Sequence, residues 1–181
     1  MLVNTVNLPN LLSLLRLCLV PVIIVMISSH AWLSAFAVFV VAGITDAVDG
    51  FIAKRFNQRT ELGAYLDPLA DKALLVSIYI TLAIVTVIPV WLAVLVVARD
   101  IMILGAIILS LLLNNPMTIE PLKISKANTF AQIAFAAMML GTLAFNVNSP
   151  LIYNGMTILV AILTIGSMGA YLSLWLKHMT K

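Results

Sequence analysis

The chain is a series of long apolar stretches separated by short polar breaks. Six stretches are each near the roughly 20 residues that a helix needs to cross a bilayer, and we read each as a hydrophobic helix. Their approximate ranges are 8–29, 31–55, 63–87, 89–113, 125–146 and 151–176, with Asn7 as a cap and Pro9 in the first turn of the first helix. The pattern predicts an all-α, polytopic membrane protein with six transmembrane helices.

Turn-forming residues mark the breaks between these stretches. Ser28-Ser29-His30 separates the first two helices, Ile88-Pro89 the third and fourth, and Asn148-Ser149-Pro150 the last two. The longest polar connections are Phe56–Leu62 and Asn114–Ile124. We find no internal repeat, low-complexity tract or separate soluble segment, so we predict one domain over residues 1–181.

Composition supports the membrane prediction and excludes other classes. The 181 residues are 63% hydrophobic and 9% charged, and the mean hydropathy is +1.15, far from a soluble mixture. The single cysteine, Cys18, rules out an intrachain disulfide or a zinc cluster, and no segment resembles a nucleic-acid module. The beginning of the sequence lacks a basic segment before its apolar run, so we expect no removable targeting segment.

The basic residues predict the orientation in the membrane. Most of them follow the second, fourth and sixth helices, and the opposite turns carry no lysine or arginine. These residues are Lys54, Arg55, Arg59, Lys72, Lys123, Lys126, Lys177 and Lys181. By the positive-inside rule, both termini lie in the cytoplasm. We therefore predict a multi-pass protein of a bacterial cytoplasmic (inner) membrane with its active site on the cytoplasmic side.

Residues 45–72 hold five of the seven acidic residues of the chain. Asp46 and Asp49 are three residues apart near the end of the second helix, and Asp67 and Asp71 are four apart near the start of the third. Each pair shares a helix face, and a short loop would bring the pairs together. Four such carboxylates repel one another unless hard cations bind them, which predicts two divalent cations, Mg²⁺ or Mn²⁺, between helices two and three. Such a pair suits in-line displacement at phosphorus.

Neighbouring residues fit a phosphate-containing ligand beside these acids. Gly50, Ala53 and Gly63 leave room for a bulky ligand or for a close approach of helices. Lys54 and Thr60 stand at the rim, within reach of a phosphate.

Simpler interpretations apply to each of these residues alone. A single aspartate near a helix end is more often a cap or a solvated side chain than a ligand, and small residues often serve helix packing. Four aspartates at these spacings favour a site. Pro68, directly after Asp67, marks either the start of the third helix or a bend in it.

Polar residues on the other helices form further candidates. Asn10, Ser13 and Arg16 share a side of the first helix, where Arg16 either approaches a phosphate or extends to lipid headgroups. Arg99 and Asp100 lie inside the fourth helix, and since adjacent residues on a helix do not face each other, we expect both to find partners elsewhere.

The start of the fifth helix carries a polar stripe with Lys126 nearby. Its members are Ser125, Asn128, Thr129 and Gln132. Acceptor binding and hydrogen bonding between helices explain this stripe equally well.

A longer motif joins the acidic residues. The run D-A-V-D-G-F-I-A-K, eight residues, G-A-Y-L-D-P-L-A-D resembles the signature of the CDP-alcohol phosphatidyltransferases, D-x-x-D-G-x-x-A-R, eight residues, G-x-x-x-D-x-x-x-D. Every spacing agrees. The one departure is Lys54, where the family usually has arginine; it keeps the charge and loses the bidentate geometry. Arg55 lies beside it.

The resemblance implies a reaction and a role for each motif residue. Family members transfer a phosphatidyl or similar group from a CDP-linked donor to an alcohol and release CMP. The four aspartates, Asp46, Asp49, Asp67 and Asp71, would hold two metals on the diphosphate, and Asp71 would also take the proton from the attacking hydroxyl. Gly50, Lys54, Thr60 and Gly63 would line the nucleotide side. Members are typically homodimers.

Segments outside the motif indicate which alcohol is the acceptor. Three of them resemble stretches of the eukaryotic-type cardiolipin synthases in this family: N-L-P-N-L-L-S-L-L-R, A-R-D-I-M and I-S-K-A-N-T-F-A-Q. This resemblance implies CDP-diacylglycerol as donor and phosphatidylglycerol as acceptor. The alternative is a phosphatidylglycerophosphate synthase, whose acceptor is glycerol 3-phosphate. Those enzymes tend to have a lysine where this chain has Asn128, and a phosphomonoester dianion should require more cationic donors. That alternative stays open because four cations could bind a small phosphate: Arg16, Arg99, Lys123 and Lys126. Asn10 is a further candidate for binding the acceptor or a phosphate.

A cation transporter is the alternative from another class, because intramembrane carboxylates also mark ion pathways. Clustering of the acids at the cytoplasmic end, in place of a path across the midplane, argues against it.

Overall fold

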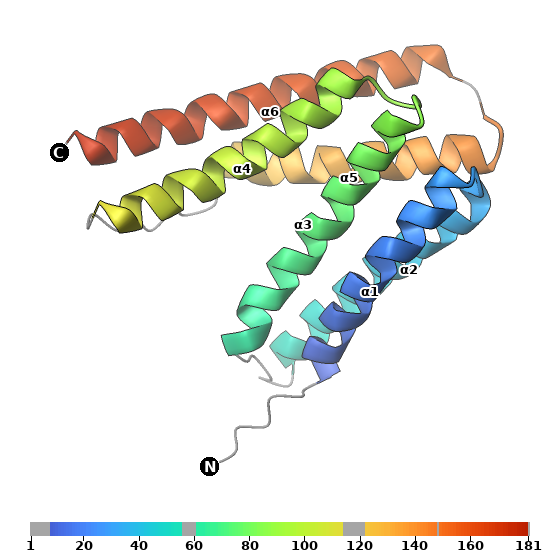
Figure 1. The fold of residues 1–181 in the computed structure, drawn as a ribbon, viewed down its shortest axis with the longest axis horizontal. Helices are drawn as coiled ribbons and strands as arrows, with labels where there is room; N and C mark the ends of the chain where they lie inside the picture. The colour runs from blue at the N-terminus through green and yellow to red at the C-terminus, as the bar shows by residue number, and fades with distance from the viewer. Residues whose placement is uncertain (1–7, 56–60, 114–121, 148, 181) are drawn as a thin grey trace. The chain divides into compact units, whose positions relative to one another are not determined.

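The fold is all-α, as the apolar pattern predicts (Figure 1). A computed structural model describes residues 8–55, 61–113, 122–147 and 149–180, and for residues 8, 9, 49–55, 61–66 and 111 it describes the backbone alone. The six helices in the described part are α1 (Leu8–Ser28), α2 (Trp32–Arg55), α3 (Glu61–Ile84), α4 (Val90–Leu112), α5 (Lys123–Ala144) and α6 (Pro150–Met179). Each agrees with the predicted range to within about three residues, because the apolar runs and their breaks set helix length.

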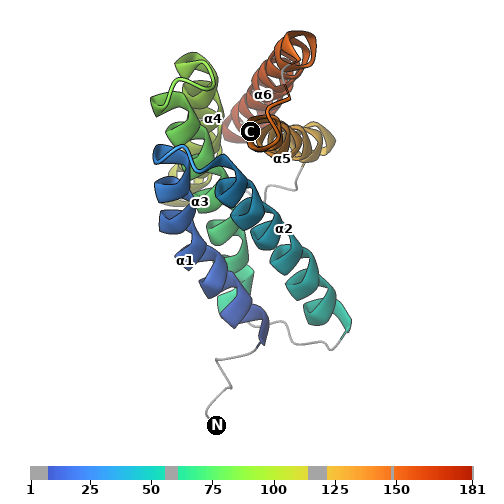
Figure 2. The ribbon, with the colours of Figure 1, turned by 90° about the vertical axis from the view of Figure 1, so that its right-hand side faces the viewer.

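The helices form two compact units. The first contains α1, α2, α3 and the segment 137–147 with the end of α5, and the second contains α4, the first part of α5 and α6. Within the first unit, α1 packs against both α2 and α3 (Figures 1 and 2). Within the second, α4 packs against α6. The predicted acidic pairs on α2 and α3 therefore have α1 as their common neighbour.

The sequence leaves open whether Pro68 starts the third helix or lies within it. The helix begins at Glu61, and Pro68 lies inside it. Pro68 lacks the N–H that would continue the hydrogen-bond ladder, so the first turns of α3 hold one bond fewer than a regular helix. The predicted cap Asn7 lies outside the described residues, and α1 itself begins with Leu8 and Pro9.

Three helices of the first unit end in the same way. His30, Thr86 and Asn146 follow α1, α3 and α5 with φ angles of 57°, 60° and 54°, in the left-handed region. The backbone N–H of the residue that follows each of them donates to the carbonyl five residues earlier in the chain. These bonds join Ala31 to Met26, Val87 to Leu82 and Val147 to Thr142, each at 2.9 Å. This is the Schellman arrangement, and it caps carbonyls that would otherwise lack donors.

The distribution of polar and apolar side chains is that of a membrane protein. Arg16, Arg99 and Asn128 are at most 2% exposed, whereas Leu151 and Phe130 are 85% and 74% exposed. In water this distribution would be strongly unfavourable, and in a bilayer it is the favourable one.

Helix length and composition agree with this distribution. Within the described part, four helices are long and apolar enough to cross a membrane: Asn10–Ser28, Val90–Ser110, Lys123–Ala144 and Pro150–Met179. A shorter apolar segment, Trp32–Val48, lies in α2. These helices indicate a multi-pass membrane protein, and six spans remain a prediction.

Candidate active site

A buried polar face on α1 meets the acidic residues of α2 and α3. Asn10, Ser13 and Arg16 follow one another at intervals of three residues, which places them along one side of the helix. They are 2%, 0% and 1% exposed. Burial of three polar side chains requires partners inside the protein. The alternative in which Arg16 extends to lipid headgroups is therefore wrong.

Arg16 joins two of the four predicted aspartates. Its Nη2 lies 3.0 Å from Oδ1 of Asp46 on α2, and its Nη1 donates to Oδ1 of Asp71 on α3. The nitrogens belong to one planar guanidinium, so the two carboxylates lie within the span of a single side chain. The convergence of the two helix ends, which the spacing of the aspartates predicts, is present. Both carboxylates are about half exposed, at 49% and 46%, so the pair also borders open space.

Asp67 of α3 is bound by Ser13, which lies on α1 like Arg16. The Ser13 hydroxyl donates to Oδ1 of Asp67, one turn before Asp71 on α3. A hydroxyl donor fixes the direction of the carboxylate. Helix α1 thus contacts all three motif aspartates whose side chains the structure describes.

The described carboxylates fit hard cations by their chemistry. Carboxylate oxygens are the ligands that Mg²⁺ and Mn²⁺ prefer, and Asp46 and Asp71 already share one positive charge, that of Arg16. Among the side chains that the structure describes, no three acidic, histidine or cysteine groups are grouped closely enough to hold a metal. The side chain of Asp49 lies outside that set. The two-metal site therefore stays a prediction.

The predicted donor-binding residues fall at the ends of α2 and α3. Gly50, Ala53 and Lys54 lie in the last turns of α2 and Gly63 in the first turn of α3, where only the backbone is described. Thr60 lies outside the described residues.

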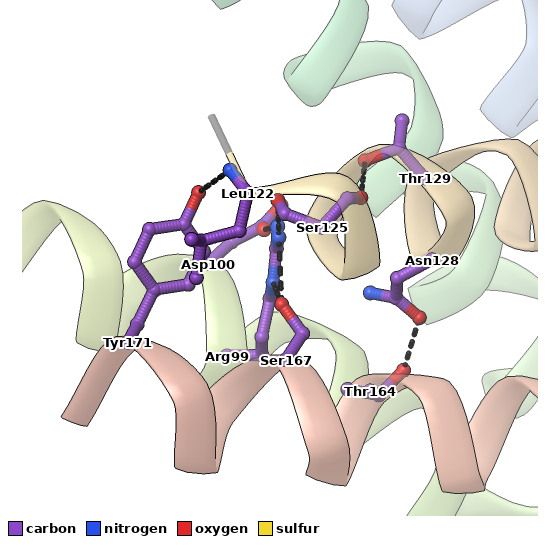
Figure 3. Close-up of polar contacts among 9 residues, drawn as sticks. All are labelled: Arg99, Asp100, Leu122, Ser125, Asn128, Thr129, Thr164, Ser167 and Tyr171. Atoms are coloured by element: carbon purple, nitrogen blue, oxygen red, sulfur yellow. Dashed lines mark hydrogen bonds and ion pairs between the residues drawn. The ribbon is translucent and has the colours of Figure 1, made fainter. Parts of the chain in front are cut away.

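A second polar cluster lies in the other unit, centred on Arg99 of α4 (Figure 3). Arg99 is 2% exposed, and its Nη1 lies 2.6 Å from Oδ1 of Asp100. The prediction that these neighbours do not face each other is wrong. The long arginine side chain bends back far enough to reach the adjacent carboxylate, because burial of either charge alone would cost more than the bend.

Two other nitrogens of Arg99 donate to α5 and α6, as expected for a residue that needs partners on other helices. Nε and Nη2 donate to the Ser167 hydroxyl at 3.2 and 3.1 Å, and Nη2 also donates to Ser125. The guanidinium carbon lies 5.9 Å from the ring centre of Tyr171, in the range of a cation–π contact. The Tyr171 hydroxyl accepts the backbone N–H of Leu122 at 3.4 Å, just before α5.

Two members of the polar stripe at the start of α5, Ser125 and Asn128, contact other helices. Asn128 is fully buried, and its Oδ1 accepts a hydrogen bond from Thr164 of α6 at 2.9 Å. Thr129 donates to the Ser125 carbonyl of its own helix at 3.2 Å, and Lys126 is exposed. Of the predicted acceptor-binding residues, Arg99, Lys126 and Asn128 lie in the second unit, whereas Asn10 and Arg16 lie in the first.

Sequence reasoning missed the α6 members of this cluster. Thr164, Ser167 and Tyr171 have relative positions i, i+3 and i+7 and are all buried. They form a polar stripe within an apolar helix, the same signal that identified the stripe on α5.

Comparison with known proteins identifies the class. The family model of the CDP-alcohol phosphatidyltransferases matches residues 6–170. The chain therefore belongs to the CDP-alcohol phosphatidyltransferase family. Apart from Tyr171, both polar clusters lie within the matched segment.

Among its relatives are proteins whose names give two different activities. The chain is 38% identical over 159 residues to the cardiolipin synthase (CMP-forming) of Rattus norvegicus and 37% identical to that of Homo sapiens. Each match covers 79% of this chain and 53% of the relative. It is also 36% identical over 151 residues to a probable phosphatidylglycerophosphate synthase of Mycobacterium tuberculosis, covering 80% of this chain and 69% of that protein. The chain thus spans about half the length of the cardiolipin synthases that it matches.

Proposed function

We propose that the protein is a phospholipid synthase that transfers a phosphatidyl group from CDP-diacylglycerol to phosphatidylglycerol, giving cardiolipin and CMP. One observation carries the proposal most directly: Arg16 contacts both Asp46 and Asp71. This contact brings carboxylates from both halves of the family motif to one place, beside the helix ends where the other motif residues lie. Membership of the family supplies the reaction class.

In the proposed reaction, Asp46, Asp49, Asp67 and Asp71 hold two divalent cations, Mg²⁺ or Mn²⁺. When bound, these ions supply charge neutralisation for the donor diphosphate. The described carboxylates favour this role because their oxygens are hard ligands and the Ser13 hydroxyl keeps one of them oriented.

The chain's own residues account for the remaining parts of the reaction. Asp71 acts as general base and takes the proton of the attacking hydroxyl. Its side chain is 46% exposed, so an acceptor can reach it. Gly50, Ala53, Lys54, Thr60 and Gly63 form the nucleotide side, at the ends of α2 and α3.

The acceptor is assigned to polar groups of α1, α4 and α5. Asn10, Arg16, Arg99, Lys126 and Asn128 are the proposed acceptor- or phosphate-binding residues. Phosphatidylglycerol is favoured because the relatives with the highest identity given above are cardiolipin synthases. Glycerol 3-phosphate is the second candidate, since a probable phosphatidylglycerophosphate synthase is almost as similar.

The proposal includes the arrangement in the membrane. We place one domain over residues 1–181 with six spans in a bacterial cytoplasmic membrane, with the acidic site on the cytoplasmic side where CDP-linked donors and divalent cations are available. The exposed apolar faces fit surrounding lipid and a homodimer.

The test is release of CMP by purified protein from CDP-diacylglycerol and Mg²⁺ or Mn²⁺. The acceptors compared are phosphatidylglycerol, glycerol 3-phosphate, inositol phosphate and serine. We expect phosphatidylglycerol to support turnover and to give cardiolipin. Preferred turnover with glycerol 3-phosphate would assign the alternative acceptor.

A pair of variants checks the catalytic assignment. Asp71→Asn should abolish turnover with every acceptor while donor binding is partly retained. Glu61→Gln, an acid-to-amide change earlier on the same helix and at an unspecified position of the motif's eight-residue spacer, should leave turnover near wild type. Near-normal turnover in Asp71→Asn would remove this residue from the base role.

The cation transporter is tested in liposomes made with the same protein. We expect CMP release and no movement of cations. Cation flux without CMP release would overturn the enzymatic proposal.

A further inference from the structure

Arg16 is a buried cation at the edge of a partly open acidic site. Its side chain is 1% exposed, whereas the side chains of Asp46 and Asp71 that it contacts are 49% and 46% exposed. The guanidinium therefore reaches the two carboxylates from the side of α1, and their open side is accessible to ions and ligands. The protein thus supplies one positive charge of its own to a site where we propose that further cations bind.

This charge remains beside the acids under physiological conditions. Arginine is not deprotonated in proteins, and its planar guanidinium can donate to two carboxylates at once. Withdrawal of Arg16 toward the apolar part of the bundle would leave a buried charge without a counterion, which is strongly unfavourable. The side chain therefore stays next to anions, and it contacts both Asp46 and Asp71.

A divalent cation on either carboxylate would lie close to the guanidinium. Mg²⁺ binds carboxylate oxygens at about 2.0–2.1 Å. The Arg16 Nη2 lies 3.0 Å from Oδ1 of Asp46, so the ion and the guanidinium would share the same carboxylate a few ångströms apart. Repulsion between like charges at such separations is significant even in water. Arg16 therefore opposes the binding of divalent cations to acids that otherwise attract them.

A donor diphosphate changes this balance of charge. Arg16 cancels one of the four negative charges of the motif aspartates, so two divalent cations would exceed the remaining three by one positive charge. An excess charge at a partly buried site is unfavourable unless a counterion accompanies it. The diphosphate supplies that counterion, and its oxygens are also suitable bidentate acceptors for a guanidinium.

We propose that Arg16 couples the binding of divalent cations to the binding of the CDP-linked donor. Without the donor, the guanidinium charge lowers the affinity of the acids for cations. With the donor, the diphosphate compensates both the ions and the guanidinium, and the affinity for cations rises. By thermodynamic linkage, the cations raise the affinity for the donor by the same factor. The inference rests on the proposed transferase function, because it requires a donor with a diphosphate.

The experiment measures Mn²⁺ binding to the purified full chain in detergent by electron paramagnetic resonance, without and with CDP-diacylglycerol. Micelles that contain the donor and no protein give the background. Wild-type protein should bind Mn²⁺ at least about tenfold more tightly when the donor is present, within the usual range of coupling between sites. Arg16→Gln, without the donor, should bind Mn²⁺ at least about tenfold more tightly than wild type, because the repelling charge is gone. Its further gain from the donor should be several times smaller than that of wild type.

Three other variants control for folding and for the loss of charge elsewhere. Arg16→Lys keeps the charge, and its Mn²⁺ affinity without the donor should stay within about threefold of wild type. Lys177→Gln removes an exposed positive charge from α6 and should match wild type under both conditions. Thermal unfolding in detergent identifies folded variants, and Arg16→Met, which keeps the length of the side chain without its charge, replaces Arg16→Gln if that variant does not fold.

The outcomes separate this inference from the proposed function. Equal Mn²⁺ affinity in wild type and a folded variant without the Arg16 charge would overturn the coupling, even if wild-type protein releases CMP. The absence of a donor effect on Mn²⁺ binding in wild type would also overturn it, and this result needs no variant. Wild-type protein that neither binds Mn²⁺ nor releases CMP with any acceptor would overturn the proposed function and this inference together.

Discussion

The Arg16 Nη2 lies 3.0 Å from the Asp46 Oδ1, inside the membrane-protein fold and 30 residues apart in the sequence. The same guanidinium bonds Asp71 from a third helix. A 1% exposed arginine between two half-exposed carboxylates provides one positive charge where the motif concentrates negative charge. Arg16 and divalent cations would therefore compensate the same carboxylates.

Removal of Arg16 should make the protein depend more strongly on divalent cations for stability. Arg16→Leu leaves Asp46 and Asp71 to repel each other, and we expect a loss of about 1 kcal/mol in unfolding free energy after allowance for their exposure to solvent. Added Mg²⁺ should raise the unfolding temperature of this variant more than that of wild type, because ligands that bind the folded state stabilise it. Thermal unfolding in detergent with EDTA or Mg²⁺ measures this. Lys177→Leu, at an exposed cation of α6, is the control, and an equal Mg²⁺ effect in all three proteins would contradict the prediction.

Ser13 should matter through the orientation of Asp67. Ser13→Ala removes the hydroxyl that donates to Asp67, and hydrogen bonds to charged groups contribute about 1.5–3 kcal/mol. We expect kcat/KM for CDP-diacylglycerol to fall by at least about tenfold in a protein that still unfolds cooperatively in detergent. Ser29→Ala, which removes an exposed hydroxyl bonded to the Val25 carbonyl, should behave like wild type. Full activity in Ser13→Ala would show that Asp67 needs no such donor.

Arg99 and Asp100 should contribute to stability as a coupled pair. Asp100→Leu leaves the buried guanidinium without its countercharge and should cost about 3 kcal/mol in unfolding free energy. The double variant Arg99→Met/Asp100→Leu removes both charges, and we expect it to recover more than half of that loss. A double-mutant cycle on unfolding stability measures the coupling. Additive effects of the two substitutions would rule out the pairing.

Thr86 should be a position where glycine is more stable than the native residue. It follows α3 with φ of 60°, is exposed, and is β-branched, so it is strained in the left-handed region. Thr86→Gly should raise the unfolding free energy by about 0.5–1 kcal/mol, since the relief of strain exceeds the entropy cost of glycine. Thr86→Ala, which keeps a Cβ, should gain less. A lower unfolding temperature in the glycine variant would argue against this turn geometry.

The helices of this protein could be predicted closely, because each apolar run is long and each break contains strong turn formers. The convergence of Asp46 with Asp71 could also be predicted, since two helices joined by a short connection bring their facing ends together. The start of α3 could not, because Pro68 is compatible with both a first turn and an interior position. In the structure the helix begins at Glu61, before Pro68, and α3 packs along α1.

The cluster around Arg99 contains contacts that could not be predicted from the sequence, for a different reason. Helix geometry alone places neighbouring residues on different faces, and it gave the wrong prediction for Arg99 and Asp100 because a long flexible side chain can return to its own helix. Thr164, Ser167 and Tyr171 escaped notice because a few polar residues in an apolar helix carry no sign of their partners.

The sequence by itself determined the class of this protein: the apolar runs require a membrane, and the spaced aspartates define the family. The tertiary structure alone decided which groups satisfy the buried polar atoms, placing Arg16 between two carboxylates and Thr164 against Asn128. The physical reason is that helix formation depends on local residue pattern, whereas burial of a polar group depends on partners that packing brings from distant segments.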